Sequence, residues 1–140
     1  MLHVTFITVG DLPRGAFQEL RGTYLKYLLR YARIDHRAIK DDKDVLHRVD
    51  PSTTVVVLDA AGAAMTSEAF AKKIQGYDEI GTKLTIIIGG AFGLPDDVKK
   101  RADVLLSISP MTTTHDLAHI FFLEQLYRAF TIITGKEYHK

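Results

Sequence analysis

The chain of 140 residues contains no cysteine. This absence excludes disulfide bonds and thiolate metal sites, and it suits a reducing compartment. No apolar run is long enough to cross a membrane as a helix. The N-terminal residues also lack the basic segment and long apolar stretch of a signal peptide. We therefore expect a cytoplasmic protein that makes no membrane contact.

Neither sign of charge dominates the sequence. Its 18 Lys and Arg residues and 17 Asp and Glu residues give a net charge of +1. Non-specific attraction to nucleic acid is therefore weak, so an RNA partner requires a local basic patch or a second surface. The sequence also has no repeat, low-complexity tract or linker. A content of 46% hydrophobic and 25% charged residues predicts one globular domain, residues 1–140.

Short β-like runs alternate with helical patterns along the chain. The predicted strands cover residues 4–9, 34–39, 54–58, 84–88 and 104–108. The predicted helices cover 15–32, 66–77 and 115–134, with a short helix starting at Pro95 and a short helix or loop at 41–49. The β-branched run 54–58 is typical of a strand buried on both faces, whereas 34–39 alternates like an edge strand. This order predicts an α/β fold with a mostly parallel sheet flanked by helices.

Three loops follow predicted buried strands: residues 59–65, 89–95 and 109–114. Ligands of open α/β sheets bind at the carboxyl ends of the strands, so we expect these loops to form one pocket. Gly89, Gly90 and Gly93 would let the backbone approach a ligand. The order G-x-G-x-x-G is absent, which disfavours a nicotinamide or flavin dinucleotide. A plain tight turn and an adenosine-type ligand held by backbone groups remain open.

His115 and His119 lie one helical turn apart, which is the spacing of zinc ligands in some metalloproteases. However, Asp116 follows the first histidine where those enzymes carry Glu, and no third ligand is evident. The simpler interpretation is a helix N-terminus with His115 in its first turn. We expect no metal.

The last predicted helix is apolar nearly all round. Its large apolar residues are Leu117, Ile120, Phe121, Phe122, Leu123, Leu126, Tyr127, Phe130 and Ile133. Such a helix lies in the centre of a core or is covered by another subunit, and we favour a homodimer. Glu124 and Arg128 are spaced i,i+4 on it. They form either a modest surface ion pair or a pair close to the interface.

Several segments together carry a family resemblance. They are residues 4–10, 57–59, 88–90, 93–94, 107–109, 111–112, 115, 124–130 and 135–140. With these segments the chain resembles the ribosomal RNA large-subunit methyltransferase H family. Its members belong to the SPOUT (α/β-knot) superfamily and methylate N3 of a pseudouridine in large-subunit rRNA. The resemblance spans the chain, and Tyr138-His139-Lys140 at its end is highly specific.

The resemblance implies an S-adenosylmethionine-dependent methyltransferase that acts as a homodimer on large-subunit rRNA in the assembled ribosome. It also implies a C-terminal trefoil knot, which general folding rules would not predict. Carried over by position, the cofactor-binding residues are Leu58, Gly89, Ile108, Ser109, Pro110, Met111, Thr112 and Thr113. We expect the catalytic residues to be His115, Glu124, Arg128, Tyr138 and His139. The resemblance implies that the C-terminal tail helps to complete the active site and to hold RNA.

The sequence departs from the family pattern at Ala91-Phe92, Thr114, His119 and in a shortened segment 40–50. The last two departures remove positive charge, which concerns RNA binding rather than the cofactor pocket. The acceptor of the N3 proton stays open among His115, Glu124, His139 and solvent. Arg128 and Lys140 are candidates for stabilising the anionic base. The alternatives are a non-catalytic ribosome-associated dimer and another nucleotide-cofactor-binding α/β protein, such as a nicotinamide-dependent reductase.

Overall fold

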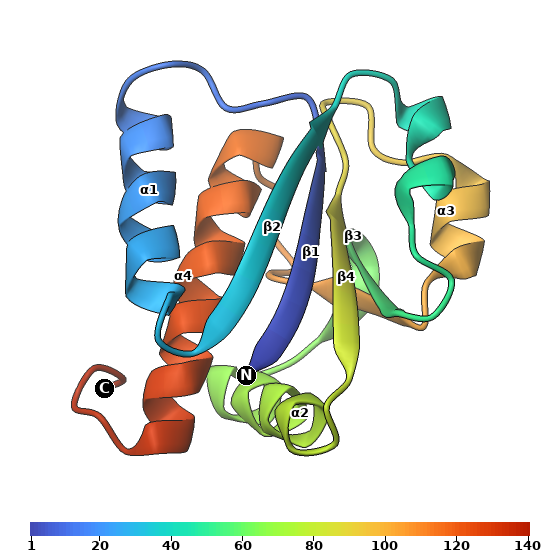
Figure 1. Cartoon of the computed structure of the whole chain (residues 1–140). Helices are drawn as coiled ribbons and strands as arrows, with labels where there is room; N and C mark the ends of the chain where they lie inside the picture. Colours follow the sequence, from blue (N-terminus) through green and yellow to red (C-terminus); the bar gives the residue numbers. More distant parts are fainter.

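The computed structural model describes every residue from Met1 to Lys140, and Figure 1 shows a central sheet with helices on both sides. The strands are β1 (Leu2–Val9), β2 (Ala32–Ile39), β3 (Thr54–Ala64), β4 (Lys83–Ile88) and β5 (Val104–Ser107). The α-helices are α1 (Ala16–Leu28), α2 (Ser67–Glu79), α3 (Asp96–Arg101) and α4 (His115–Thr134). Two 3₁₀ helices, η1 (Asp42–Asp44) and η2 (Leu46–Arg48), occupy the segment predicted as a short helix or loop. The predicted α/β fold is confirmed.

The five strands form one sheet in the order β2-β1-β4-β3-β5. Every neighbouring pair is parallel, so all five carboxyl ends meet at the same edge of the sheet. The prediction of an edge strand at β2 is confirmed, and β5 forms the opposite edge. The trefoil knot stays a prediction. No helix combines the length and apolarity that crossing a membrane requires.

The two faces of the sheet bury different clusters, because successive side chains of a strand point to opposite sides. On β1, Phe6 belongs to the cluster under α1, α2 and α4, whereas Ile7 belongs to the cluster under α3 and the 3₁₀ helices. α4 packs against both α1 and α2. Figure 1 shows α1 and α4 on one side of the sheet and α3 on the other. The apolar surface of α4 is thus largely buried in this chain's own core, through Phe122, Leu123 and Leu126.

Side-chain and glycine caps set the helix ends as the sequence indicates. The Thr66 Oγ1 accepts a hydrogen bond from the Ala69 amide at the start of α2, and Gly135 ends α4 with φ 73°. The prediction for the first helix was too long, since α1 ends at Leu28 and a turn leads directly into β2. Leu28 is fully buried whereas Leu29 is 70% exposed, so the amphipathic pattern ends there. Pro95 is the cap of α3 rather than its first helical residue.

The third strand is longer than predicted. β3 continues to Ala64, and its register shifts between Leu58 and Ala63, both of which pair with Leu106 of β5. Gly62 permits this arrangement, because a Cβ atom there would lie 2.6 Å from the Leu105 carbonyl carbon. The prediction of a free loop over 59–65 was therefore wrong: the first part is a bulge, and the second part returns to the sheet.

Candidate functional site

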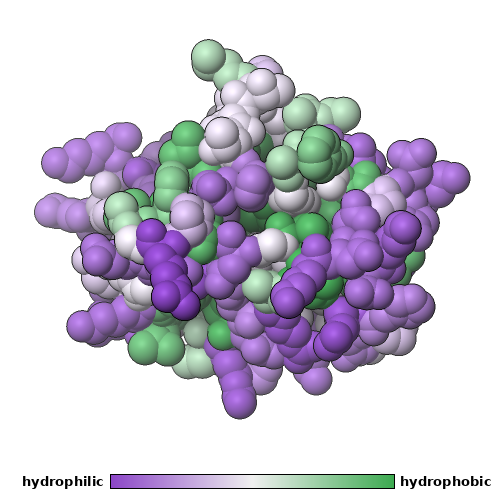
Figure 2. All heavy atoms as spheres, turned by 90° about the horizontal axis from the view of Figure 1, so that it is seen from above, coloured by the Kyte–Doolittle hydropathy of each residue, from purple (hydrophilic) through white to green (hydrophobic).

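A cavity of about 520 Å³ opens at the carboxyl ends of β3, β4 and β5. Three segments line it: Leu58 to Ala60, Ile88 to Leu94, and Leu106 to Asp116, with Ala118 and Lys99 in addition. Phe92 and Pro110 are the exceptions within these segments. Figure 2 looks onto this end of the molecule and shows apolar residues in a recessed region among hydrophilic side chains. The predicted convergence of three strand ends on one pocket is confirmed.

The glycine loop forms one wall of this cavity through close backbone packing. A Cβ atom on Gly89 would lie 2.8 Å from Leu94 Cγ and 2.9 Å from the Gly93 carbonyl carbon, distances that real Cβ atoms do not reach. The Gly93 amide donates a hydrogen bond of 3.1 Å to the Gly90 carbonyl, which closes a turn. Gly93 has φ 78°, a conformation that favours glycine. This backbone can lie against a ligand without side chains between them.

The loop after β5 forms the opposite wall and is held by short-range hydrogen bonds. The Ser107 hydroxyl donates to the Ser109 carbonyl at 2.9 Å, and the Met111 amide donates to the Ser109 hydroxyl at 3.0 Å. Thr114 Oγ1 caps α4 by accepting from the Leu117 amide. The amino end of a 20-residue helix therefore adjoins the cavity, with His115 and Asp116 on its wall. Its free backbone amides favour polar or negatively charged ligand groups.

Seven of the eight predicted cofactor-binding residues line the cavity. They are Leu58, Gly89, Ile108, Ser109, Met111, Thr112 and Thr113. Pro110 is exposed and lies outside the lining. The Ser109 hydrogen bonds on either side of it turn the backbone there, so its neighbours face the cavity and its ring does not.

One ion pair and one contact between an imidazole and a carboxylate lie at the cavity. Lys99 Nζ lies 3.3 Å from Asp59 Oδ2 in the ion pair, and His115 Nε2 lies 3.2 Å from Asp116 Oδ1 in the other contact. The sequence reasoning missed Lys99 as a pocket residue, because it stands in the run Lys99-Lys100-Arg101 that suggests a solvent-exposed basic patch. Only the packing of α3 beside β3 brings it to Asp59.

The two histidines of the zinc-like spacing point to different places. His115 lines the cavity, whereas His119 is 3% exposed and packs edge-on against Phe6 with ring centroids 4.8 Å apart. Burial, with a smaller contribution from His36, lowers the pKa of His119 to about 3. No group of three or more His, Asp or Glu side chains is placed to hold a metal ion. The geometry therefore gives no support to a site shared by His115 and His119.

A second cavity of about 410 Å³ adjoins the first and shares the loop from Ile108 to Thr113. Its other residues come from α1 and α4: Tyr24, Leu117, Ile120, Phe121 and Glu124. Leu117 and Phe121 are 49% and 44% exposed. Glu124, a predicted catalytic residue, lines this second cavity and does not line the first.

The C-terminal tail is bound to its own chain through Glu124 and Arg128. Glu124 Oε1 accepts hydrogen bonds from Arg128 Nη2 at 2.6 Å and from the Tyr138 hydroxyl at 3.0 Å. The Arg128 guanidinium also lies 4.9 Å from the centre of the Tyr138 ring. Burial and the bond to Glu124 raise the pKa of Tyr138 to about 12. The bond to Glu124 raises the pKa of Arg128 as well, so at neutral pH Tyr138 stays protonated and Arg128 stays charged.

His139 connects this network to α2. Its Nδ1 lies 3.1 Å from Arg128 Nη1 and its Nε2 lies 2.7 Å from Glu68 Oε1. The hydrogen bond from His139 lowers the pKa of Glu68. The structure thus brings together four of the five predicted catalytic residues, Glu124, Arg128, Tyr138 and His139. His115 lies apart from them at the cavity.

The chain leaves α4 at the end opposite to His115, as Figure 1 shows, and the tail then folds back along the helix as far as Glu124. Glu124 follows His115 by nine residues, about 14 Å along the helix at a rise of about 1.5 Å per residue. No residue of the tail lines the cavity of its own chain. The predicted active site is divided between two regions of the molecule.

The fold and the cavity define an α/β protein that can hold a nucleotide-like ligand on backbone turns at its strand ends. A family model described as "Predicted SPOUT methyltransferase" matches residues 2–139. The chain belongs to this SPOUT methyltransferase family. The resemblance noted from the sequence is confirmed.

Curated relatives match over nearly the full length of the chain. The "Ribosomal RNA large subunit methyltransferase H" of Maridesulfovibrio salexigens is 37% identical, with 99% of each chain covered. The protein of the same name from Carboxydothermus hydrogenoformans is also 37% identical, with coverage of 99% of this chain and 100% of the relative.

Solved structures share the fold at low sequence identity. A "probable methylase family protein" from Haemophilus influenzae Rd KW20 aligns with TM-score 0.61 and 11% identity, over 98% of this chain and 70% of its own. A structure described by "the 2-OH methylation of C/U34 on tRNA" aligns with TM-score 0.56 and 15% identity, over 93% of this chain and 91% of its own. These similarities concern the fold alone.

Proposed function

We propose that this protein transfers a methyl group from S-adenosylmethionine to large-subunit ribosomal RNA. The observation that carries the proposal is the 520 Å³ cavity between three strand-end segments, in a chain that matches the SPOUT methyltransferase model from residue 2 to residue 139. The names of the full-length relatives supply the substrate class. The resemblance narrows the target to N3 of a pseudouridine. Such a substrate places the protein in the cytoplasm.

The lining residues suit the cofactor in shape and charge. Leu58 and Ile108 offer apolar surface for an adenine ring, and Gly89 lines the cavity with its backbone alone. Lys99 and Asp59 supply charges that complement the carboxylate and ammonium of the methionine part. When bound, S-adenosylmethionine supplies a methyl group already activated by the sulfonium. The protein therefore mainly has to align the nucleophile with it.

The tail network suits proton removal and charge stabilisation at the base. Tyr138, with a pKa of about 12, acts as a hydrogen-bond donor rather than as a base at neutral pH. Arg128 remains a cation and stabilises negative charge on the deprotonated base. His139 is the tail residue that could accept the proton and pass it to solvent, once Nδ1 exchanges its contact with Arg128 for the base, because both ring nitrogens are occupied in this structure.

We infer that two copies of the chain combine to make the complete site. Within one chain, no residue of the tail lines the cavity, and the contacts of the tail on α4 begin at Glu124, nine residues after His115. The exposed Leu117 and Phe121 lie beside the loop 108–113 and offer an apolar surface to a second copy. A homodimer that packs on this surface would bring the tail of one copy to the cavity of the other. Glu124 lies beside the same surface and connects it to the tail.

The substrate that we propose is rRNA within the assembled ribosome. A net charge of +1 gives the chain little general attraction for RNA. Asp and Glu residues are interspersed among the Lys and Arg residues along the sequence, which weakens any basic patch that could bind RNA. A ribosome supplies additional surfaces and a fixed RNA shape, which would compensate for the weak electrostatics.

The decisive test is methylation of ribosomes that lack the modification. The protein and labelled S-adenosylmethionine are incubated with these ribosomes, and the rRNA is digested and analysed by mass spectrometry. We expect one additional methyl group on a single nucleoside of large-subunit rRNA. Co-sedimentation with ribosomes, without cofactor binding or methyl transfer, would instead indicate a non-catalytic ribosome-associated protein.

A further inference from the structure

Phe92 is a fully exposed aromatic residue at the rim of the candidate cofactor cavity. Its exposed fraction is 103%, the highest among the large apolar side chains of the chain. Its neighbours Ala91 and Gly93 line the cavity, whereas Phe92 does not. The ring therefore stands outside the space assigned to the cofactor and beside its opening.

The turn that carries Phe92 is anchored at both ends. Gly90 and Gly93 form an antiparallel bridge, closed by the hydrogen bond from the Gly93 amide to the Gly90 carbonyl. A Cβ atom on Gly90 would lie 3.4 Å from the Val9 carbonyl oxygen, so the turn rests on the end of β1. Phe92 occupies the tip of this turn. The bridge holds both ends of the turn and the ring at its tip is fully exposed.

A fully exposed phenyl ring gains no hydrophobic stabilisation, so this ring contributes nothing to folding. An aromatic ring held at the mouth of a cavity can instead stack on a planar ligand. Single-stranded RNA offers such ligands, because its unstacked bases bind the faces of aromatic side chains. The chain has little positive charge with which to hold RNA, which increases the importance of such contacts.

We propose that Phe92 is a positioning residue that stacks on an unpaired base of the RNA substrate at the entrance of the cavity. This inference rests on the proposed function and adds a substrate contact outside the cofactor residues and the tail. The stacked ring fixes the plane of the RNA at the opening, which helps to align the reacting nitrogen with the methyl group. Stacking depends on the aromatic face, so a side chain of similar volume without that face cannot replace it.

The test compares three variants under saturating S-adenosylmethionine while the concentration of unmodified ribosomes is varied. Phe92→Leu keeps an apolar side chain and removes the ring, and should lower kcat/KM for ribosomes about tenfold, within the range of base–aromatic stacking. Phe92→Tyr keeps the ring and should stay within about threefold of wild type. Ile80→Ala removes another apolar side chain, 79% exposed and distant from the cavity at the end of α2, and should not change kcat/KM. The cofactor affinity measured by calorimetry should be the same in all three.

The possible failures are distinguishable. If wild-type protein transfers no methyl group to ribosomes, the proposed function fails and this inference with it. If wild type is active and Phe92→Leu keeps the wild-type kcat/KM, the stacking role is wrong while the proposed function stands. If Phe92→Leu lowers the mass of the protein in sedimentation experiments, the ring belongs to a subunit interface and the inference is also overturned.

Discussion

The Tyr138 hydroxyl donates a hydrogen bond of 3.0 Å to Glu124 Oε1, and this contact joins the C-terminal tail to the middle of α4. The same carboxylate oxygen accepts from the Arg128 guanidinium, so it links the tail to a partly buried cation. Glu124 also lines the second cavity, which shares the loop 108–113 with the first, so the contact connects the tail to the neighbourhood of the cofactor site.

Removal of this hydroxyl should affect methyl transfer more than folding. Tyr138→Phe keeps the ring over Arg128 and removes one hydrogen bond, which contributes about 1 kcal/mol to stability. We expect methylation of ribosomes to fall about tenfold, because the tail loses a hydrogen bond that holds it on Glu124 and about 1.4 kcal/mol is a factor of ten. Cofactor affinity by calorimetry should change less than twofold. Tyr77→Phe, at the far end of α2 from Glu68, is the control and should retain wild-type activity.

Deletion of residues 138–140 should separate cofactor binding from catalysis. The tail does not line the cavity, so the truncated protein should bind S-adenosylmethionine as wild type does. Methyl transfer should fall at least a hundredfold, because the donor Tyr138 and the proton acceptor His139 are both removed. Full activity of the truncated protein would remove the tail from the mechanism.

A complementation experiment shows whether the tail acts on the other copy. The truncated chain is mixed with a full-length Gly89→Val chain, whose cavity wall is displaced because the new side chain collides with Gly93 and Leu94. If the tail acts across the dimer, the mixed pair contains one intact cavity served by one intact tail, and activity returns. If each tail serves its own chain, every species in the mixture stays inactive.

The glycine wall of the cavity should not tolerate even one methyl group. In Gly89→Ala the new Cβ would meet the Gly93 backbone and Leu94, so the loop must shift. We expect cofactor affinity to fall at least tenfold and the free energy of unfolding to fall by about 1–3 kcal/mol, as for overpacked sites. Gly76→Ala on α2 is the control, since no atom lies within 4 Å of its added Cβ. That variant should be more stable by about 1 kcal/mol, with unchanged cofactor affinity.

A charge on the exposed face of α4 should dissociate the proposed dimer. Phe121→Asp places a carboxylate among Leu117, Ile120 and Tyr24, where a second copy would have to bury it. Sedimentation should show a monomer that still binds S-adenosylmethionine and no longer methylates ribosomes. Ile80→Asp, at a more exposed apolar position on α2, should leave the mass unchanged. A monomeric wild-type protein with full activity would contradict the two-copy site.

The buried His119 should make the protein less stable in acid. Its pKa is about 3 in the folded state against an ordinary value of 6.5. Between these values the unfolded chain binds a proton that the folded chain does not, so stability falls as the pH falls below about 6.5. The slope approaches about 1.4 kcal/mol per pH unit for one such group. Lowering the pH from 7 to 5 should therefore cost about 2 kcal/mol.

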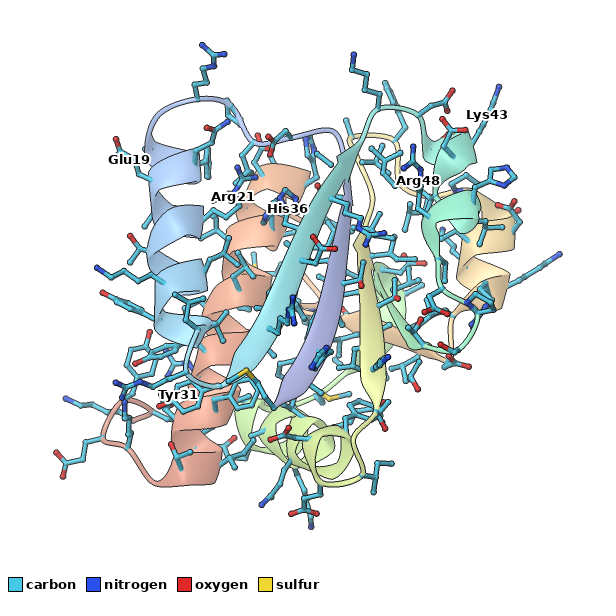
Figure 3. The ribbon with its side chains drawn as sticks, viewed as in Figure 1. Glu19, Arg21, Tyr31, His36, Lys43 and Arg48 are labelled. Atoms are coloured by element: carbon cyan, nitrogen blue, oxygen red, sulfur yellow. The ribbon has the colours of Figure 1, made fainter.

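Two substitutions isolate this effect in urea unfolding at pH 7 and pH 5. His119→Leu removes the titrating ring and should abolish most of the loss. His47→Leu replaces an exposed histidine, and this variant should still lose stability between pH 7 and pH 5 as wild type does. His36 also lowers the stability in acid, by a smaller amount, because burial and Arg21 lower its pKa. Figure 3 shows Arg21 on α1 and His36 on β2 pointing toward one another. An unchanged pH dependence in His119→Leu would contradict the buried neutral histidine.

The sequence by itself determined the order of the elements and the loops that form the cavity. Periodicity and glycine caps specify the helices, and β-branched runs specify buried strands, because these signals act between residues close in the chain. A parallel sheet places all its carboxyl ends on one edge, so Gly89 and the loop after β5 could be assigned to one pocket in advance. The resemblance added the identity of the tail residues, which no local pattern predicts.

Only the tertiary structure decided which distant residues share that pocket and which do not. Lys99 reaches Asp59 because α3 packs beside β3, and β3 re-enters the sheet after its bulge because Gly62 has no side chain to clash with β5. His119 turns into the core and His115 into the cavity, although the sequence places them on one helix a single turn apart. The tail closes on Glu124, Arg128 and Glu68 and does not line its own cavity. These outcomes depend on contacts between segments remote in the chain, whose energies are set by packing and burial rather than by any pattern of neighbouring residues.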